Sequence, residues 1–318
     1  MPFYMVRLWL EGPIATPMIS GTLFGHLCWA YRWRFGEQRF AQWLGEMESQ
    51  PLLISDAMPR GYLPKPLLRA QPRDPEPLEA ASLKALKKQP WLSRDQFLRI
   101  RDHLNEDSLL AALTADEQTR ERERAARRSE PFPEAIAGMA RIPHNTINRL
   151  TNRTLQQGGL YFTDEEWPSQ AAKEREVYVQ TVLDPPLLRD LFTQTGKMGY
   201  GRDASAGRGQ FSVLDIESAP DGLFDAPGSR RMSLSHGSLT PNMTEARYRL
   251  HTHFGKVGGL FSISAKPFKK PLTLLRPGAT FRPADDGPFG ELLRKVYSVN
   301  PRVVHCAWHL TVPYTEKD

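Results

Sequence analysis

A glycine-rich stretch between a helix pattern and a strand pattern constrains the fold of this chain most. Val177 to Leu183 alternates as a strand does, and Asp184 followed by Pro185 is typical of a helix start, because Asp caps free amides and proline tolerates the first helical position. The helix leads into GKMGYGRDASAGRGQF and then into a strand pattern from Gln210 to Ile216. Strand, helix, glycine-rich loop and strand form the second half of a ferredoxin-like unit.

The first half of such a unit lies at the start of the chain. Phe3 to Leu10 alternates between two faces, as expected of a strand, and a helix pattern follows. Ser20 is the expected N-terminal cap of that helix, and Gly36 is expected to end or interrupt it. We therefore expect an α+β fold whose N-terminal ferredoxin-like domain spans residues 1–216, with a charged helical insertion at about 71–140.

Residues 217–318 have a different pattern. Strands are predicted at Tyr248 to Phe254 and at Val303 to Val312, with a short helix at Glu291 to Tyr297. We expect a second, irregular sheet domain here.

The charge of the chain is unevenly distributed. It holds 42 Lys and Arg residues against 36 Asp and Glu residues, a net charge of +6. Three windows contain no acidic residue: Ala57 to Arg73, Arg141 to Thr163 and Ala246 to Ala284. Together they hold fifteen basic residues, which leaves −9 for the rest of the chain. Long basic stretches without acids are typical of a surface that faces a polyanion, although chance clustering explains any one of them.

Composition narrows the class of protein. No apolar run approaches the ~20 residues that a membrane-spanning helix needs, and the apolar fraction of 40% is too high for a disordered chain. Two cysteines, Cys28 and Cys306, make no disulfide framework, which points to a reducing compartment. The sequence predicts a cytoplasmic protein with no membrane partner.

The glycine-rich stretch matches no defined phosphate-binding motif. Five residues separate Gly201 from Gly207, where a Walker loop has four, and Ala204 breaks the dinucleotide fingerprint. Glycines still let a backbone approach a ligand closely, and the basic residues supply charge for phosphates; the alternative is that the glycines only make turns. The candidate RNA-binding residues of this stretch are Lys197, Gly199, Gly201, Arg202, Ser205, Gly207, Arg208 and Gly209.

PHNTINRLTNRT, from Pro143 to Thr154, is a second candidate. It contains no acid and precedes GGLYF, whose aromatic residues are able to stack on unpaired bases. The alternative is a polar loop that leads into an edge strand, but we favour RNA contact. The candidates in this stretch are His144, Asn145, Asn148, Arg149 and Arg153.

Catalytic and metal-binding patterns are weak. The pairs His251 with His253 and His305 with His309 lack a third ligand at metal spacing, so we expect neither a metal nor a cofactor. His26 lies beside the apolar face of the first helix and is a possible general base, but it has no recognisable acid partner. Nothing in the sequence demands catalysis.

Four ordered segments resemble a known family. SGTLFGHLCWAYR, LLISDAMPRGYLPKPLL, PHNTINRLTNRTLQQGGLYF and GYGRDASAGRGQF are similar to segments of the fourth subunit of the type III-A CRISPR Csm effector complex, a member of the RAMP superfamily. The later YRLHTHFGKVGG and RPGATF follow in the same order, so the resemblance covers nearly the whole chain. Arg208 stands where the family's loop has lysine, an exchange that phosphate binding should survive.

The resemblance implies a fold and a role. It implies two ferredoxin-like (RRM-like) RAMP domains in a non-catalytic subunit that holds the 5′ repeat-derived handle of the CRISPR RNA. Its implied partners are this RNA, the large polymerase-domain subunit and the backbone RAMP subunits. Lys65 in the PKP turn and Lys256 in the later segment join the handle-binding candidates.

Three alternatives remain open at this point. A related RAMP endonuclease cuts precursor CRISPR RNA without metal, and His26 or His144 would then be its base. The corresponding subunit of another type III subtype is the second alternative. A protein–protein adaptor with no RNA role is the third.

Overall fold

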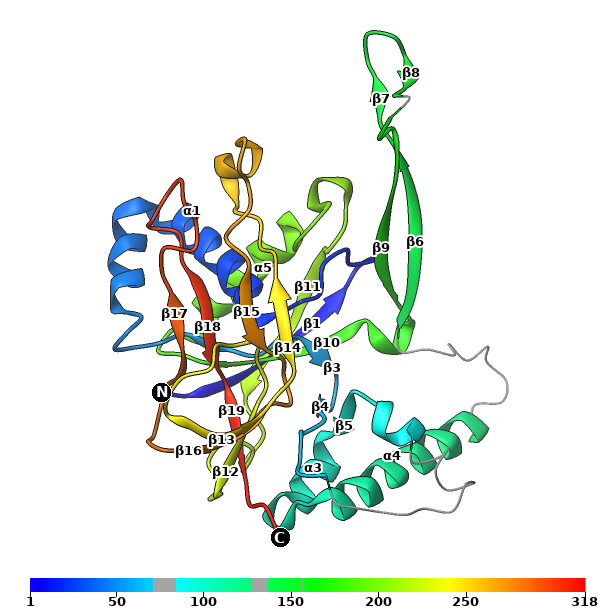
Figure 1. Ribbon diagram of the computed structural model, residues 1–318, viewed down its shortest axis with the longest axis vertical. Helices are drawn as coiled ribbons and strands as arrows, with labels where there is room; N and C mark the ends of the chain where they lie inside the picture. The colour runs from blue at the N-terminus through cyan, green and yellow to red at the C-terminus, as the bar shows by residue number, and fades with distance from the viewer. Residues whose placement is uncertain (71–83, 127–136, 156, 318) are drawn as a thin grey trace.

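The computed structural model describes residues 1–70, 84–126, 137–155 and 157–317. It is a mixed arrangement of helices and antiparallel sheets, which confirms the predicted α+β class (Figure 1). The prediction of a charged helical insertion at about 71–140 falls partly on 71–83 and 127–136, which lie outside the described residues.

A central antiparallel sheet organises the N-terminal part of the chain. Its strand order is β11-β1-β10-β2, and β3 also pairs with β10. Val6, Leu8 and Leu10 on one face of β1 are completely buried, as their alternation predicts. The strands are β1 (Phe3–Leu10), β2 (Leu53–Ile54), β3 (Met58–Pro59), β10 (Glu174–Gln180) and β11 (Phe211–Ser218).

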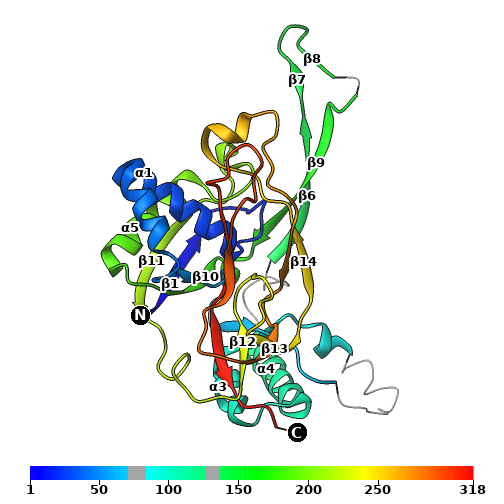
Figure 2. The same ribbon diagram turned by 60° about the vertical axis from the view of Figure 1, so that its left-hand side comes forward.

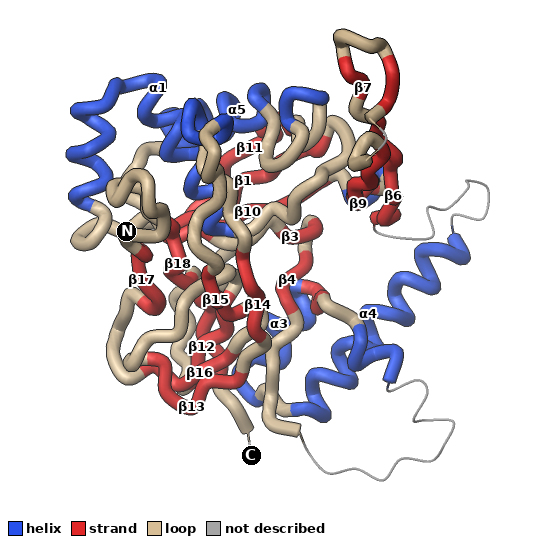
Figure 3. Tube along the Cα trace, turned by 45° about the horizontal axis from the view of Figure 1, so that its top comes forward, coloured by secondary structure: helices blue, strands red, loops and turns tan. Residues whose placement is uncertain are grey.

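Two helices, α1 (Ser20–Glu46) and α5 (Pro185–Met198), pack together on one side of this sheet (Figure 3). Gly36 interrupts α1 with φ 81°, as predicted. Asp184 caps α5 by accepting a hydrogen bond from the amide of Leu187 at 2.8 Å, also as predicted. The predicted Ser20 cap is wrong: the cap position is Ile19, and the Ser20 hydroxyl donates to the carbonyl of His236 instead.

The described part of the insertion contains strand and helix and packs against the end of the chain. The amide of Leu104 donates to the carbonyl of Thr315, and that of Lys317 donates to the carbonyl of Leu104. Asp116 accepts hydrogen bonds from both the amide and the hydroxyl of Ser93, which caps the helix Arg94–Ile100. The elements of the insertion include β5 (Trp91–Ser93), α3 (Arg94–Ile100) and α4 (Glu106–Ala126), and β5 pairs with β4 (Tyr62–Pro64), which precedes the insertion.

A long β-hairpin projects from the body of the molecule (Figures 1 and 2). Strands β6 (Ala137–Asn145) and β9 (Leu160–Pro168) form it, in a register that places His144 opposite Tyr161. Two short strands, β7 (Ile147–Asn148) and β8 (Arg153–Thr154), pair at its tip. We call residues 137–168 the hairpin.

The C-terminal part is built from small antiparallel sheets. The helix predicted at Glu291 to Tyr297 is wrong, because β17 (Phe289–Leu293) is a strand paired with β18 (His305–His309), and Leu292 is buried in that pairing. Tertiary burial has overridden local propensity here. The other strands are β12 (Arg230–Ser233), β13 (Met243–Arg247), β14 (Leu250–His253), β15 (Leu272–Leu275), β16 (Thr280–Pro283) and β19 (Thr311–Tyr314).

One hydrophobic cluster joins the two parts of the chain. It includes Leu27 of α1, Tyr178 of β10, and Leu234 and Trp308 from beyond residue 216. The amide of Asp56 also donates to the carbonyl of Leu234. The C-terminal part is therefore held firmly against the N-terminal part, and segments far apart in sequence meet between them.

Candidate nucleic-acid interface

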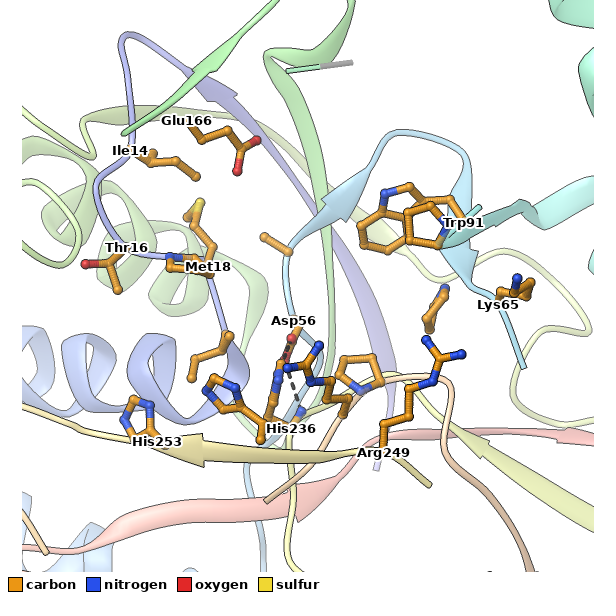
Figure 4. Close-up of a pocket in the computed structure, with 18 of the residues that line it drawn as sticks. Ile14, Thr16, Met18, Asp56, Lys65, Trp91, Glu166, His236, Arg249 and His253 are labelled. Atoms are coloured by element: carbon orange, nitrogen blue, oxygen red, sulfur yellow. Dashed lines mark hydrogen bonds and ion pairs between the residues drawn. The ribbon is translucent and has the colours of Figure 1, made fainter. Parts of the chain in front are cut away.

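A cavity of about 870 Å³ lies where the two parts of the chain meet (Figure 4). Its walls come from residues 14–19, 56–67, 88–91, 249–254 and 276–277, with single residues from the neighbouring strands. We call it the central cavity.

The charge of the central cavity is mainly positive. Its cations are Lys65, Lys88, Arg175, Arg249 and Arg276, and its carboxylates are Asp56 and Glu166. Glu166 is paired with Arg175, so four cations remain against one acid. Burial lowers the pKa of Lys65, and the nearby charges of Arg249 and Lys87 lower it further. A concave site with this charge suits a phosphate chain.

Asp56 fixes one wall of the central cavity. Its Oδ1 accepts hydrogen bonds from the amides of Ser20 at 2.9 Å and His236 at 3.1 Å. Its Oδ2 lies 2.6 Å from Nδ1 of His236. Figure 4 shows Asp56 and His236 next to each other in the wall of the cavity, joined by a dashed line. Asp56 thus ties α1 to a loop of the C-terminal part and sets the orientation of the imidazole.

Three of the four histidines that the sequence pairs as weak metal candidates, His251, His253 and His305, form a row with His236, whereas His309 bonds to Ser233 and Ser238 instead. The ring centroids of His236 and His251 lie 4.7 Å apart, and those of His253 and His305 lie 4.9 Å apart. Burial lowers the pKa of His253 to about 4 and that of His305 well below its ordinary value. Within the described residues, no three His, Cys, Asp or Glu side chains are placed to hold a metal ion.

The glycine loop, residues 199–209, lies between α5 and β11. All four of its glycines have positive φ values, which glycine adopts readily. Its amides are partly used within the protein: Gly201 donates to Nε2 of His26 at 3.1 Å, and Arg202 donates to Oγ1 of Thr16 at 2.9 Å. These two amides therefore already have partners within the protein. Thr16 also lines the central cavity, so the loop borders it.

The basic side chains of the glycine loop differ in exposure. Nε of Arg208 lies 2.9 Å from Oε1 of Glu165, whose side chain is completely buried at the base of the hairpin. Arg208 also stacks over the ring of Trp167, with its guanidinium carbon 6.0 Å from the centroid. Arg202 is exposed and donates to the carbonyl of Asp164 at 3.3 Å. Lys197 and Ser205 are exposed beside the loop.

The hairpin holds the second set of predicted residues. Asn145 donates to Oγ1 of Thr154 at 2.9 Å, and Oδ1 of Asn148 accepts from the amide of Leu150. These two amide side chains therefore shape the tip. His144 stacks on Tyr161, with centroids 5.1 Å apart and planes 13° apart, and its Nε2 lies 2.7 Å from Oγ1 of Thr163.

The two arginines of the tip face solvent. Arg149 and Arg153 are exposed, and neither makes an ion pair within the described ranges. Apolar side chains beside them are also exposed, with Leu150 97% accessible. The tip therefore offers cations and apolar surface to a partner.

His26 is not placed as a general base. Its Nε2 already accepts the Gly201 amide, and burial lowers its pKa to about 4. A base for RNA cleavage must be free to accept the proton of a substrate hydroxyl. Three described histidines line the central cavity, and of these His236 is the one that is paired with a carboxylate, that of Asp56.

The structure separates most of the predicted residues. Lys65 lines the central cavity, whereas the glycine loop contacts Thr16 of the cavity wall and does not line the cavity itself. The hairpin tip lies apart from the cavity, and Lys256 lines a second, smaller pocket. The sequence analysis did not single out Lys88, Arg175, Arg249, Arg276 or the Asp56–His236 pair. Arg249 and Arg276 belong to the acid-free window of residues 246–284, so the absence of acids there was the sequence feature that could have indicated them.

Comparison with known proteins shows the fold. No family model matches the sequence, and no curated protein sequence matches it. A chain of the crystal structure of a Csm1–Csm4 cassette in complex with cA4 is 15% identical with a TM-score of 0.61, and the match covers 100% of both chains. A chain of a Csm3–Csm4 subcomplex of the type III-A CRISPR-Cas interference complex is 14% identical with a TM-score of 0.58, and the match covers 99% of both.

Csm4 is the component that these two assemblies share. A third match, to the Csm1–Csm4 cassette in complex with pppApA, has 17% identity and a TM-score of 0.57 over 99% of this chain and 98% of the other. The resemblance found in the sequence motifs is confirmed at the level of the fold. No helix in the described part of the chain is long and apolar enough to cross a membrane.

Proposed function

We propose that this chain is the Csm4-type subunit of a cytoplasmic type III-A CRISPR effector complex, which holds the 5′ repeat-derived handle of the CRISPR RNA and has no catalytic role. The observation that carries the proposal is the central cavity, where Lys65, Lys88, Arg249 and Arg276 gather and the one acid besides Glu166 is Asp56, which is paired with His236. The fold is shared with chains of Csm1–Csm4 and Csm3–Csm4 assemblies.

The partners follow from the same similarity. We infer that the chain docks a large polymerase-domain subunit and backbone RAMP subunits, as the named components of the similar assemblies suggest. The central sheet order β11-β1-β10-β2, with its two helices, supports a ferredoxin-like N-terminal unit within residues 1–216. A second ferredoxin-like unit in 217–318 remains part of the proposal; its described residues contain strands and a 3₁₀ turn but no α-helix.

We assign the predicted residues different parts in RNA binding. Lys65 would neutralise phosphates in the central cavity, and Arg202 would continue this path along the glycine loop. Arg149 and Arg153, with the stacked His144 and Tyr161, would meet RNA or a neighbouring subunit at the hairpin. Arg208 would act indirectly, by holding the glycine loop to the hairpin.

RNA binding at several salt concentrations tests the central cavity. We expect the double variant Arg249→Ala with Arg276→Ala to bind handle-containing single-stranded RNA at least about tenfold more weakly, because hydrogen bonds to charged groups contribute about 1.5–3 kcal/mol each. The slope of log affinity against log salt should fall by about 0.7 for each arginine. The matched control is Arg282→Ala, an exposed arginine paired with Glu245 outside the cavity. Unchanged affinity and slope in the double variant would overturn the assignment.

The nuclease alternative has one geometric candidate. The Asp56–His236 pair lies in a basic cavity, and a carboxylate-oriented imidazole is what a general base for RNA cleavage requires. Incubating the protein with repeat RNA in a chelator separates the two functions. We expect intact RNA; reproducible cleavage that His236→Ala abolishes would replace the scaffold role with an enzymatic one.

A further inference from the structure

A second pocket, separate from the central cavity, lies beside α1. Its volume is about 270 Å³, and its walls come from α1, residues 256–269 and residues 300–304. Figures 1 and 2 show these two loops next to the first half of α1. We call it the α1 pocket.

The α1 pocket has an excess of cations. Lys256, Lys269 and Arg302 line it, and its remaining charged residues, Arg32 and Glu37, are paired with each other. The pocket therefore carries three positive charges without a compensating carboxylate among the described residues that line it. Such a charge in a concave site attracts an anion.

Lys269 is the cation set deepest. Its ammonium donates to the carbonyl of Val304 at 3.0 Å and has no carboxylate partner among the residues that the structure describes. Burial lowers its pKa to about 8, so it is still mostly charged at neutral pH. An ammonium has three donors, and only one is used here, so Lys269 has two left for an anion in the pocket.

Aromatic side chains form the rest of the wall. Trp29, Phe40 and Phe261 line the pocket. Trp29 lies against two glycines: a Cβ atom on Gly258 would come within 2.4 Å of the indole nitrogen, and one on Gly259 within 2.5 Å of the ring. The loop is thus shaped to hold the indole in place, and flat aromatic surfaces beside cations are the usual surroundings of a nucleobase and its phosphate.

We propose that the α1 pocket binds one nucleoside phosphate, with the phosphate on Lys256, Lys269 and Arg302 and the base against Trp29 and Phe261. The volume lies just below the range of pockets for drug-sized ligands, so it suits one nucleotide and not a longer segment. The same chemistry is offered by a free mononucleotide and by a nucleotide of an RNA chain.

The position of the glycine loop connects the two cavities. Thr16 lines the central cavity and accepts the Arg202 amide, whereas His26 lines the α1 pocket and accepts the Gly201 amide. Adjacent amides of one loop therefore contact the walls of both sites. If the chain holds RNA in the central cavity as proposed above, the glycine loop stands between that RNA and the α1 pocket, in contact with one wall of each.

Titration of the purified full chain tests the pocket. We would add AMP, GMP, CMP, UMP and inorganic phosphate separately and follow tryptophan fluorescence and binding heat, and then repeat the titration with single-stranded RNA. We expect the double variant Lys256→Ala with Arg302→Ala to weaken nucleotide or RNA binding at least about tenfold. Both side chains are exposed, so this variant should fold even where Lys269→Met does not. The matched control is Lys266→Ala, an exposed lysine of the same loop that does not line the pocket.

The outcomes separate the sources of the ligand and the two proposals. Saturable binding of a mononucleotide, lost in the pocket variant, supports a free nucleotide; loss of RNA binding alone supports a nucleotide of the RNA. The double variant Arg249→Ala with Arg276→Ala should still bind mononucleotides. If the central cavity proves not to bind RNA, the titration of the α1 pocket with mononucleotides therefore still decides this proposal. Equal binding by the parent and the pocket variant in every titration would overturn the proposal.

Discussion

The glycine loop and the hairpin carry the same kinds of residue in the sequence but are built in opposite ways. In the glycine loop, Arg208 pairs with a fully buried carboxylate, and two amides bond to Thr16 and His26. In the hairpin, Arg149 and Arg153 extend into solvent from the tip. An arginine beside glycine or asparagine therefore predicts a basic loop. It does not show whether the charge of that arginine stabilises the fold or binds a ligand.

The difference comes from residues distant in sequence. Glu165 lies 43 positions from Arg208 and reaches it because β9 returns along the glycine loop. In the part of the chain that the structure describes, neither Arg149 nor Arg153 forms an ion pair, and both side chains are exposed. The glycine loop is thus bonded to the body of the molecule, whereas the arginines of the hairpin tip are exposed.

The largest expected difference is in stability. Arg208→Ala leaves the carboxylate of Glu165 buried without its ion pair, which should lower the free energy of unfolding by about 2–4 kcal/mol. Arg149→Ala with Arg153→Ala should change it by less than about 0.5 kcal/mol, since both side chains are exposed. Urea unfolding of the three proteins measures this.

A compensating pair of substitutions provides the control. Arg208→Met with Glu165→Gln removes both charges and should recover most of the lost stability, because no unpaired charge stays buried. An Arg208→Ala protein as stable as the parent would contradict the buried pair. This result also governs RNA tests, since a loss of binding in Arg208→Ala reports on folding as well as on contact.

The next largest expected effect is a pH dependence of the free energy of unfolding, caused by His26, which bonds to the glycine loop. Burial lowers the pKa of His26 to about 4 from an ordinary 6.5, so between these values the unfolded chain binds a proton that the folded chain does not. The stability contributed by neutral His26 is complete above pH 6.5 and is lost as the pH falls toward 4. We expect a loss of about 2 kcal/mol from this group at pH 4.5, measured by urea unfolding at pH 7.5 and 4.5.

The variant His26→Gln isolates that contribution. Its carbonyl oxygen is able to accept the Gly201 amide without titrating, so its stability should fall less on acidification than that of the parent. Other buried histidines, including His253 and His309, keep part of the acid sensitivity in both proteins. An NMR titration that gives His26 an ordinary pKa would refute the buried placement.

Much of the fold followed from local pattern. The strand Phe3–Leu10, the cap at Asp184 and the interruption at Gly36 depend on alternation, side-chain chemistry and backbone freedom that neighbouring residues already specify. The helix predicted at 291–297 and the Ser20 cap were wrong because a distant strand and a distant carbonyl offered better partners. Local sequence does not contain those contacts.

The candidate site was predictable in composition but not in arrangement. Acid-free windows located Lys65, Arg249 and Arg276 on basic segments, yet nothing local indicated that the three line one cavity. The same windows include Arg247 and Arg282, which pair with Glu316 and Glu245. Only tertiary contacts distinguish the cations that remain for a ligand.

A smaller difference in stability is expected between alanine variants at two glycines of the glycine loop. Gly201 and Gly207 have φ values of 77° and 80°, so alanine is strained at both. A Cβ atom at Gly201 would also come within 2.6 Å of Cβ of Thr16, whereas Gly207 faces open space. We expect Gly201→Ala to be about 1 kcal/mol less stable than Gly207→Ala in urea unfolding. Equal losses would show that the loop does not pack on Thr16.

The smallest expected effect is at the hairpin tip. Leu150 is 97% exposed, so its apolar surface is in water in both the folded and the unfolded chain and contributes almost nothing to folding. Leu150→Ser should therefore change the free energy of unfolding by less than about 0.5 kcal/mol, while hydrogen exchange in the rest of the hairpin stays as in the parent. A loss above about 1 kcal/mol would mean that the tip packs against the body in solution. The hairpin tip would then be packed on the body, as the glycine loop is, and its arginines would not be exposed to a partner.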